Sequence, residues 1–267
     1  MTIILIALLA LIFYFSLKKP SNHKNWQDQF VVLPSAAMSG DKICIKNIRD
    51  FRYNNDESVR EKRYLDQEYR LSEFKRAWYG ISHFGDNNLA HVFISFEFSN
   101  QSYLVVSIEA RLEKEHTSYN PVKGLFRSFN KTVVLATEQD VIGLRSHIRG
   151  ERVYLYPLDV PELYTKPLLL NFLREAQVLR DKPQFYNTLI DNCMTGLLAQ
   201  SEKFKKLSSW LDWRIVLPGG SDEIAYKHKF IDTTKGFAQL QREARINPYG
   251  YNVADDDFSQ RIREPSN

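Results

Sequence analysis

The feature that most constrains the fold is a pair of neighbouring segments in which apolar and polar residues alternate. HVFISFEF (residues 91–98) and YLVVSIEAR (residues 103–111) are separated by SNQS, which is a hairpin signal. Every second residue of each segment is apolar, so one face of each predicted strand is expected to be buried. Both apolar sets must face the same core, and a slip of one residue would turn one set away from it. The sequence therefore predicts an antiparallel hairpin of fixed register parity.

The opposite face of this hairpin carries a candidate general base. With that parity, His91 shares a face with Glu109 and Arg111, opposite or diagonal to them, within reach of cross-strand contact. A neighbouring carboxylate fixes the tautomer and orientation of a histidine, which prepares the ring to accept a proton. The alternative is a surface histidine with an ordinary salt-bridge neighbour.

A candidate nucleophile comes much later in the chain. In FYNTLIDNCMTGLL (residues 185–198), Cys193 follows a cluster of small polar residues and precedes an apolar run of helical spacing. A thiol at a helix N-terminus lies at the positive end of the helix dipole, which favours the thiolate. The only other cysteine is Cys44, and two cysteines so far apart do not resemble a disulfide framework. The alternative role of a lone cysteine is that of a small buried hydrophobe.

The remaining elements indicate the fold class. Residues 69–80 suit either a helix or a strand, TEQD at residues 137–140 is typical of a helix start, and KPLLLNFLREAQVLRDKP predicts a helix that stops at Pro183. Because strands come first and helices later, the sequence predicts the α+β class with an antiparallel sheet packed on helices. The strands expected besides the hairpin are residues 30–33, 42–48, 131–137 and 151–158.

The first residues predict a membrane anchor. Residues 3–17 (IILIALLALIFYFSL) carry no charge, and this length is near the short limit for a spanning helix. No small-residue cleavage site follows and no Lys or Arg precedes, which favours one uncleaved transmembrane helix over a signal peptide. The following Lys18, Lys19 and Lys24 would, by the positive-inside rule alone, keep the globular part in the cytoplasm. The expected divisions are an anchor at residues 1–19, a linker at 20–29 and one globular domain at 30–267.

Composition excludes several classes of function. The chain has 267 residues, of which 43% are hydrophobic, enough for one sizeable core. The net charge of +4 is scattered and forms no basic stripe with interleaved aromatics, so we expect no nucleic-acid partner. His147 and His228 have no ligand partner at useful spacing, and we expect no metal and no cofactor.

Several long motifs occur in an order that resembles a known family. They include LAHVFISFEF, SIEAR, GLFRSF, DVIGLRSHIRGERVYLYPL, KPQFYNTLIDNCMTGLL and DWRIVLPGGSDEIAYKHKFID. Together they resemble the Lnb N-terminal periplasmic domain family over nearly everything after the anchor. The resemblance implies a permuted papain-like (NlpC-type) fold and a thiol enzyme that faces the periplasm of a bacterial inner membrane, against the lysine count. The family takes its name from enzymes that move a fatty acyl chain to the N-terminal cysteine amine of lipoproteins.

The resemblance also implies catalytic roles at three positions. AH-x-x-x-SF-x-F places the family histidine at His91, S-x-E-x-R places its acid at Glu109, and NC places its nucleophile at Cys193. The chain departs from the family pattern nearby: Met194 stands where a hydroxyl residue is usual, FN at residues 129–130 replaces Tyr-Glu, and TEQD replaces a more acidic run. These departures concern the fit of a substrate more than the chemistry.

Two further sets of residues are candidates for binding charge. An oxyanion needs two donors, and besides the Cys193 backbone N–H the side chains of Asn192 or Asn187 are candidates, although asparagine at a helix start is more often a cap. Arginines on or near the hairpin could hold a phosphate or carboxylate bidentately, unless they form a solvated face paired with glutamates. The arginines proposed for anion binding are Arg111, Arg127, Arg145 and Arg149.

Three functions stay open from the sequence. The first is a membrane-anchored envelope thiol acyltransferase or acyl hydrolase that acts on lipid or lipoprotein acyl groups. Its variant is a thiol amidase or peptidase on cell-wall peptides, as in NlpC-type relatives. A non-catalytic envelope module that binds lipid or a partner protein is the alternative of a different class. The expected partner is membrane lipid, with a lipoprotein or a cell-wall peptide as a further candidate, and the sequence gives no oligomeric state.

Overall fold

The computed structural model describes residues 15, 17–85, 88–200, 212–246 and 252–264. The anchor predicted at residues 3–17 therefore lies almost wholly outside the described residues. Within the described part of the chain, no helix has both the length and the apolar character needed to cross a membrane. Residues 20–29, the expected linker, lie against the domain: Trp26 is buried, and the Asn22 side chain donates to the Leu179 carbonyl at 3.1 Å.

The centre of the fold is one large mixed sheet in which antiparallel pairing dominates. The strands are β1 (Ser35–Ser39), β2 (Lys42–Arg49), β5 (Tyr64–Arg70), β6 (Phe74–His83), β7 (Ala90–Phe98), β8 (Tyr103–Arg111), β9 (Asn130–Ala136) and β10 (Arg152–Pro157). Their order is β1-β2-β9-β8-β7-β6-β10, with β5 paired to β2, and β2–β9 is the parallel contact. A small second sheet joins β3 (Arg52–Tyr53) to β4 (Val59–Glu61). The predicted α+β class is confirmed.

The predicted hairpin is confirmed as β7 and β8, and its two strands separate at one end. The ladder between them runs from Glu97↔Tyr103 to Ile94↔Val106. Beyond that point β7 stays paired with β6 as far as Ala90, and β8 stays paired with β9 as far as Arg111. The sheet is therefore open between β7 and β8 at the end that carries His91 and Glu109.

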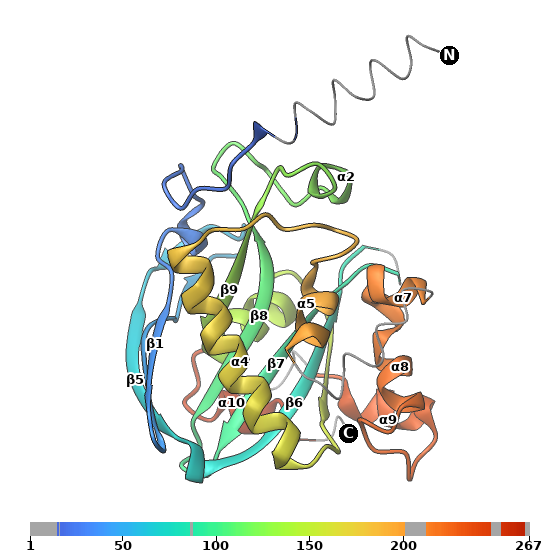
Figure 1. Ribbon diagram of the computed structural model, residues 1–267. Coiled ribbons are helices and arrows are strands. Elements are labelled where there is room, and N and C mark those ends of the chain that lie inside the picture. Colours follow the sequence, from blue (N-terminus) through green and yellow to red (C-terminus); the bar gives the residue numbers. More distant parts are fainter. Residues whose placement is uncertain (1–14, 16, 86–87, 201–211, 247–251, 265–267) are drawn as a thin grey trace, which may run out of the picture.

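Both faces of the sheet are covered, which gives the molecule two cores. On one face Val92, Ile94 and Phe96 of β7 pack with α4 (Glu162–Asp181) and α5 (Cys193–Ala199), and Figure 1 shows these helices in front of the sheet. On the other face Phe93 and Val105 pack with α3 (Glu138–Gly143) and α10 (Phe258–Arg261). The second face of the hairpin is thus buried as well, apart from the opening between the strands.

Helix α3 begins at the expected signal, whereas the strand expected at residues 30–33 was wrong: Phe30 ends the 3₁₀ turn η1 (Asp28–Phe30), and β1 begins only at Ser35. Thr137 caps α3, because its Oγ1 accepts the Asp140 N–H at 3.2 Å. Helix α3 continues directly into the π-helical turn η3 (Leu144–Ile148). The segment at residues 69–80, which suited either element, forms the end of β5, a short 3₁₀ turn η2 (Leu71–Glu73) and most of β6.

The remaining helices are short and complete the ends of the molecule. Figure 1 places α2 beside the N-terminal end of the described chain, and places α7, α8 and α9 together at the side of the sheet. These elements are η1 (Asp28–Phe30), α2 (Pro121–Gly124), α7 (Trp213–Val216), η4 (Pro218–Gly220), α8 (Ser221–Lys227) and α9 (Phe237–Ala244).

Candidate active site

The opening between β7 and β8 belongs to a cleft of about 1290 Å³. The three residues for which the sequence predicts catalytic roles, Cys193, His91 and Glu109, all line this cleft. They come from α5, β7 and β8, elements separated by about eighty residues of chain at the widest gap. The fold therefore brings together a thiol, an imidazole and a carboxylate that the sequence could connect only by hypothesis.

The His91–Glu109 contact predicted across the hairpin is confirmed. His91 Nε2 lies 3.4 Å from Glu109 Oε1, an ion-pair distance at which the two groups do not have the geometry of a hydrogen bond. Glu109 Oε1 also accepts the Ser107 hydroxyl at 2.7 Å and lies 3.7 Å from Arg145 Nη2. Both side chains of the pair are only about one-seventh exposed, at 13% for His91 and 14% for Glu109. The carboxylate is thus held by three neighbours and faces the ring.

The charges around this pair determine its protonation. Burial by itself would raise the pKa of Glu109, but the close approach of His91 and the charges of Arg145 and Arg49 outweigh burial and hold that pKa well below its usual range. Burial, and then the charge of Arg145, lowers the pKa of His91, although Glu109 opposes both. At neutral pH the pair therefore consists of a carboxylate and a neutral imidazole. Because Nε2 faces the carboxylate, the favoured tautomer carries its proton there and leaves the lone pair on Nδ1.

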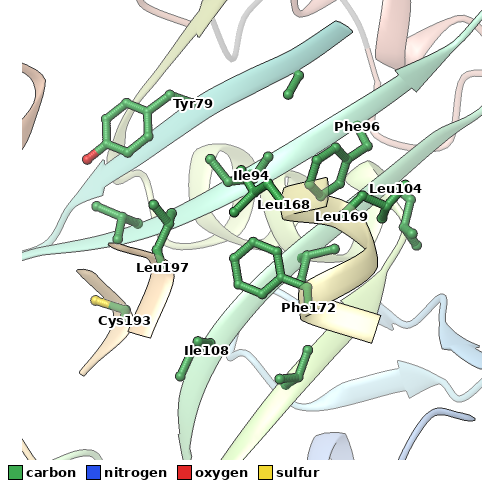
Figure 2. Packing of buried hydrophobic residues seen from close by; sticks show 14 of the residues in the cluster. Tyr79, Ile94, Phe96, Leu104, Ile108, Leu168, Leu169, Phe172, Cys193 and Leu197 are labelled. Carbon is green, nitrogen blue, oxygen red and sulfur yellow. The ribbon is translucent and has the colours of Figure 1, made fainter. Parts of the chain in front are cut away.

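Cys193 is the first residue of α5, and its side chain approaches the opening between β7 and β8 from the helix. Its side chain is 8% exposed, and Figure 2 shows it at the margin of the core cluster with the sulfur directed away from Leu197 and Phe172. The backbone N–H of Val92, the residue after His91, hydrogen bonds to the sulfur. Gly196 permits this approach, because a Cβ there would lie 2.6 Å from Ile108 Cδ1 on β8. The thiol is therefore placed against the strand that carries the histidine.

The resting thiol is protonated. Burial raises the pKa of Cys193 to about 11, although hydrogen bonds from the N–H groups of Val92 and Met194 oppose the rise. The position at a helix start was expected to favour the thiolate, but α5 has only two turns and the sulfur is cut off from solvent. Burial outweighs the helix dipole here, so a neutral thiol and a neutral imidazole line the same cleft.

Of the two asparagines considered as oxyanion donors, Asn192 caps α5 and Asn187 holds a turn. Asn192 Oδ1 accepts the N–H groups of Met194 and Thr195, and its Nδ2 donates to the Thr188 carbonyl at 2.8 Å. Asn187 Oδ1 accepts the N–H groups of Leu189 and Ile190 in a tight turn. These contacts correspond to the cap interpretation that the sequence analysis set beside the oxyanion role.

A tyrosine that the sequence analysis did not single out lies beside the nucleophile. The Tyr186 hydroxyl accepts the backbone N–H of Cys193 and donates to the Tyr119 hydroxyl, and both tyrosines line the cleft. Tyr119 in turn lies 2.8 Å from Thr188 Oγ1, which donates to the Pro121 carbonyl at 2.7 Å. Burial raises the pKa of Tyr186 well above its usual value, so the hydroxyl keeps its proton. No sequence pattern marked this residue, since a tyrosine seven positions before a cysteine carries no general signal.

A buried ion cluster holds the segment that leads to Cys193. Lys131 Nζ on β9 lies 2.8 Å from Asp191 Oδ1 and 2.8 Å from Glu175 Oε1 on α4. The lysine side chain is 6% exposed, and its two carboxylates are 29% and 20% exposed. Asp191 stands two residues before Cys193, so the lysine ties the nucleophile segment to the sheet and to the long helix. No local pattern in the sequence marks this lysine, because its partners lie on other elements.

The four arginines predicted to bind an anion lie in three different places. Arg145 and Arg149 line the cleft, where Arg149 Nε pairs with Glu57 at 2.8 Å and Arg145 lies near Glu109. Arg111 is buried and donates to the Phe30 carbonyl at 2.9 Å, within a separate hollow beside Asn22. Arg127 lines a third hollow near the N-terminal end of the described chain. The expectation of one basic set beside the hairpin is therefore corrected, because the side chains of Arg111 and Arg127 turn toward other surfaces.

The described residues include no cluster of three or more His, Cys, Asp and Glu side chains that could hold a metal ion. In a comparison with protein families, residues 60–219 match the Lnb N-terminal periplasmic domain. This range is more than half of the chain and contains His91, Glu109 and Cys193. Comparison with curated proteins and with solved structures gives no match.

Proposed function

The chain belongs to the Lnb N-terminal periplasmic domain family, and from this membership and the site geometry we propose that it is a membrane-anchored envelope thiol acyltransferase or acyl hydrolase. The acyl groups are those of membrane lipids or lipoproteins, and the fold is a permuted papain-like one. The observation that carries the proposal is the convergence of Cys193, His91 and Glu109 on one cleft from three separate elements. Such a nucleophile, base and orienting acid recur on unrelated folds that transfer acyl groups.

In the first step Cys193 takes the acyl group. As the sulfur attacks the ester or amide carbonyl carbon, His91 Nδ1 accepts the thiol proton and the carbonyl oxygen becomes an oxyanion. Glu109 stabilises the imidazolium that forms, through the contact at Nε2. The tetrahedral intermediate collapses to a thioester when the bond to the leaving group breaks, and the imidazolium gives its proton to that leaving alcohol or amine.

The second step resolves the thioester. An amine or a water molecule attacks the thioester carbon, His91 accepts its proton, and the sulfur leaves and regains that proton from the imidazolium. The pKa of Cys193 near 11 and the lowered pKa of His91 support a proton transfer that accompanies attack, rather than a thiolate–imidazolium pair formed beforehand. An acceptor amine makes the protein a transferase, whereas water makes it a hydrolase.

Two groups are the proposed donors to the oxyanion: the backbone N–H of Cys193 at the first position of α5, and the hydroxyl of Tyr186. In the resting site that N–H donates to the Tyr186 hydroxyl, which donates to Tyr119, so each donor exchanges its present partner for the oxyanion. Tyr186 takes the place considered for Asn192 or Asn187, because the Nδ2 donor of Asn192 is already bonded to the Thr188 carbonyl and the side chain of Asn187 is held in a turn by the N–H groups of Leu189 and Ile190. A buried hydroxyl that keeps its proton is suited to stabilise developing negative charge.

The experiment that tests the reaction traps the acyl-enzyme. The full chain is incubated with vesicles of a phospholipid of defined acyl chains, and the intact protein is weighed before and after treatment with neutral hydroxylamine, which cleaves thioesters. We expect one acyl group on Cys193, lost with hydroxylamine, present in Cys44→Ser and absent in Cys193→Ser. Acylation by cell-wall peptides alone would replace the proposal with an amidase, and no adduct from any donor would leave a binding module.

The side of the membrane has a separate test. Alkaline phosphatase fused after Asn267 is active only when it is exported. We expect an active fusion, because the family to which the chain belongs is that of a periplasmic domain. An inactive fusion would place the domain in the cytoplasm, as Lys18, Lys19 and Lys24 would by the positive-inside rule.

A further inference from the structure

Four large apolar side chains are exposed near the segment that carries the nucleophile. Val122 on α2 is 64% exposed and Phe126 just after it is 40% exposed, while Leu189 and Ile190 are 47% and 60% exposed. Single exposed apolar residues are common, but a group of them on adjoining segments marks a surface that contacts a partner or a membrane. We call these four residues the apolar rim.

The two segments of the apolar rim are joined to each other. Thr188 N–H donates to the Gly124 carbonyl at 3.4 Å, and Thr188 Oγ1 donates to the Pro121 carbonyl at 2.7 Å. Gly124 allows this contact, because a Cβ there would meet Thr188 Oγ1 at 2.3 Å. Helix α2 and residues 188–190 therefore form one surface and do not present two unrelated loops.

Basic side chains adjoin the apolar rim. A hollow of about 680 Å³ is lined by Val122 and Phe126 together with basic side chains. Among the described residues that line it, the one carboxylate is Glu113, which pairs with Lys24 at 2.8 Å. The basic residues of this hollow are Lys18, Lys19, Lys24, Lys123, Arg127 and His116. Apolar tips bordered by lysine and arginine are the pattern of a surface that lies on an anionic membrane.

The N-terminal segment of the described chain contacts the same surface. The ring of Phe15 lies 5.2 Å from that of Phe126, and Arg127 Nη1 donates to the Phe15 carbonyl at 3.3 Å. Leu17, which is 62% exposed, belongs to the segment predicted to enter the membrane. Figure 1 shows α2 beside this end of the described chain. An anchored domain would therefore carry the apolar rim at its membrane end.

We propose that the apolar rim inserts into the headgroup region of a bilayer that contains anionic phospholipid, with the neighbouring lysines and Arg127 on the lipid phosphates. The inference rests on the proposed function and names its substrate source: the acyl donor enters from the bilayer on which the domain sits. Ile190 precedes Cys193 by three residues, and Tyr119, which lines the cleft, directly precedes the cap of α2. The segments that carry the rim thus adjoin residues that line the cleft, and along them a lipid could reach the thiol without leaving the membrane.

The test measures contact between the rim and lipid in the full chain. The protein is reconstituted in nanodiscs of phosphatidylcholine with or without phosphatidylglycerol, with bromine atoms on the upper acyl carbons, and tryptophan quenching is compared with that of the unsubstituted chain. Val122→Trp reports on the rim, and Leu163→Trp is the matched control, since Leu163 is 74% exposed at the start of α4, at the far end of the molecule from α2 (Figure 1). We expect quenching at position 122 only.

Charge removal tests the anionic partner. Each basic residue near an anionic surface contributes about fivefold to binding, so Lys123→Gln with Arg127→Gln should shift the ratio of inserted to free rim by roughly thirtyfold. We expect quenching at position 122 to fall in discs with phosphatidylglycerol and to change little in discs without it. Lys227→Gln with Lys229→Gln, on the exposed end of α8, is the matched control and should have no effect.

Two outcomes would overturn the inference. Equal quenching at positions 122 and 163 would show that the rim does not contact lipid. A blue-shifted emission at position 122 without quenching would show that a protein, such as a second copy of this chain, covers the rim. Quenching is also measured in Cys193→Ser, which cannot form a thioester, so that membrane contact is tested without the reaction. Acylation of Cys193 by a soluble short-chain ester is measured separately, since that reaction does not need the rim. Failure of the membrane contact and failure of the chemistry are thus separate results.

Discussion

The base and the nucleophile are held in place by different kinds of structure. His91 and Glu109 lie on strands that remain paired with β6 and β9 along their outer edges, so their backbone positions follow from the sheet. Cys193 follows a short segment, residues 187–192, that depends on side chains: a cap at Asn192, an ion cluster at Lys131 and close packing at Gly196. Repeated backbone pairing fixes one half of the site, and a few specific contacts fix the other.

This difference predicts where substitutions will act. A single side chain change on the strands leaves the ladder intact, whereas one change at a contact of residues 187–192 removes a large share of what holds that segment. Substitutions around Cys193 should therefore reduce stability and reaction rate more than substitutions on the strands that carry His91 and Glu109.

The largest expected effect on stability comes from the ion cluster. Lys131→Met leaves Asp191 and Glu175 without their common partner, and the free energy of unfolding should fall by about 3 kcal/mol. Lys235→Met, which removes an exposed pair with Glu243, is the matched control and should cost about 0.5 kcal/mol or less. Urea denaturation measures both. Equal losses would show that the buried cluster does not hold the nucleophile segment.

The second effect is on the rate of acylation. Tyr186→Phe removes the proposed oxyanion donor, and the rate of thioester formation from a soluble ester should fall by about a hundredfold. Tyr119→Phe removes the acceptor of the Tyr186 hydroxyl and the bond to Thr188 but leaves the Tyr186 hydroxyl in place, so it should change the rate several-fold at most. The free energy of unfolding of each variant is measured in parallel, to separate lost chemistry from lost folding. A Tyr186→Phe rate close to that of the unsubstituted protein would remove Tyr186 from the mechanism.

The third effect concerns the contact between α5 and β8. Gly196→Ala puts a methyl group 2.6 Å from Ile108 Cδ1, so the variant should lose about 1–3 kcal/mol of stability even though alanine favours a helix. Ile108→Val removes that Cδ1, and the double variant should recover much of the loss. Gly236→Ala has no atom within 4 Å of the new methyl group and is the control. Thermal unfolding gives the comparison, and additive losses in the double variant would contradict the proposed clash.

The smallest effect is on the pH dependence of stability, and it tests the half of the site that His91 and Glu109 form. The pKa of His91 is lower in the folded state than its ordinary 6.5, so below pH 6.5 the unfolded state binds more protons and stability falls with acidification. One proton accounts for at most about 1.4 kcal/mol per pH unit. His91→Asn should therefore show a shallower loss of stability between pH 6.5 and 5 than the unsubstituted protein. Identical slopes would mean that His91 titrates normally.

The strand half of the site could be predicted from the sequence because period-two alternation fixes both the face and the register parity of a hairpin. That pattern alone placed His91 near Glu109, and the contact at 3.4 Å agrees with it. The resemblance to a family supplied Cys193 as the partner. Neither source gave the separation of β7 from β8, which depends on how each strand pairs with a neighbour far away in the chain.

The nucleophile half could be predicted only in part, because its contacts join residues distant in sequence. Tyr186, Lys131 and Gly196 act through partners on other elements, and no local pattern connects them. The prediction of a thiolate at Cys193 was wrong for a related reason. The sequence indicates where a helix starts, but the burial that raises the pKa of Cys193 to about 11 depends on tertiary packing. The spread of the arginines over three surfaces likewise depended on which way each side chain turns.

The open edge of β7 gives the strand a direct connection to the sulfur. The Val92 amide, which lies beyond the end of the β7–β8 ladder, donates to Cys193. A thioester sulfur is a weaker acceptor than a thiol, so acylation should loosen this one bond and leave the outer ladder unchanged. In a nitrogen-15-labelled sample the Val92 resonance would then act as a built-in reporter, whose chemical shift and deuterium uptake record each turnover without any dye or substrate analogue.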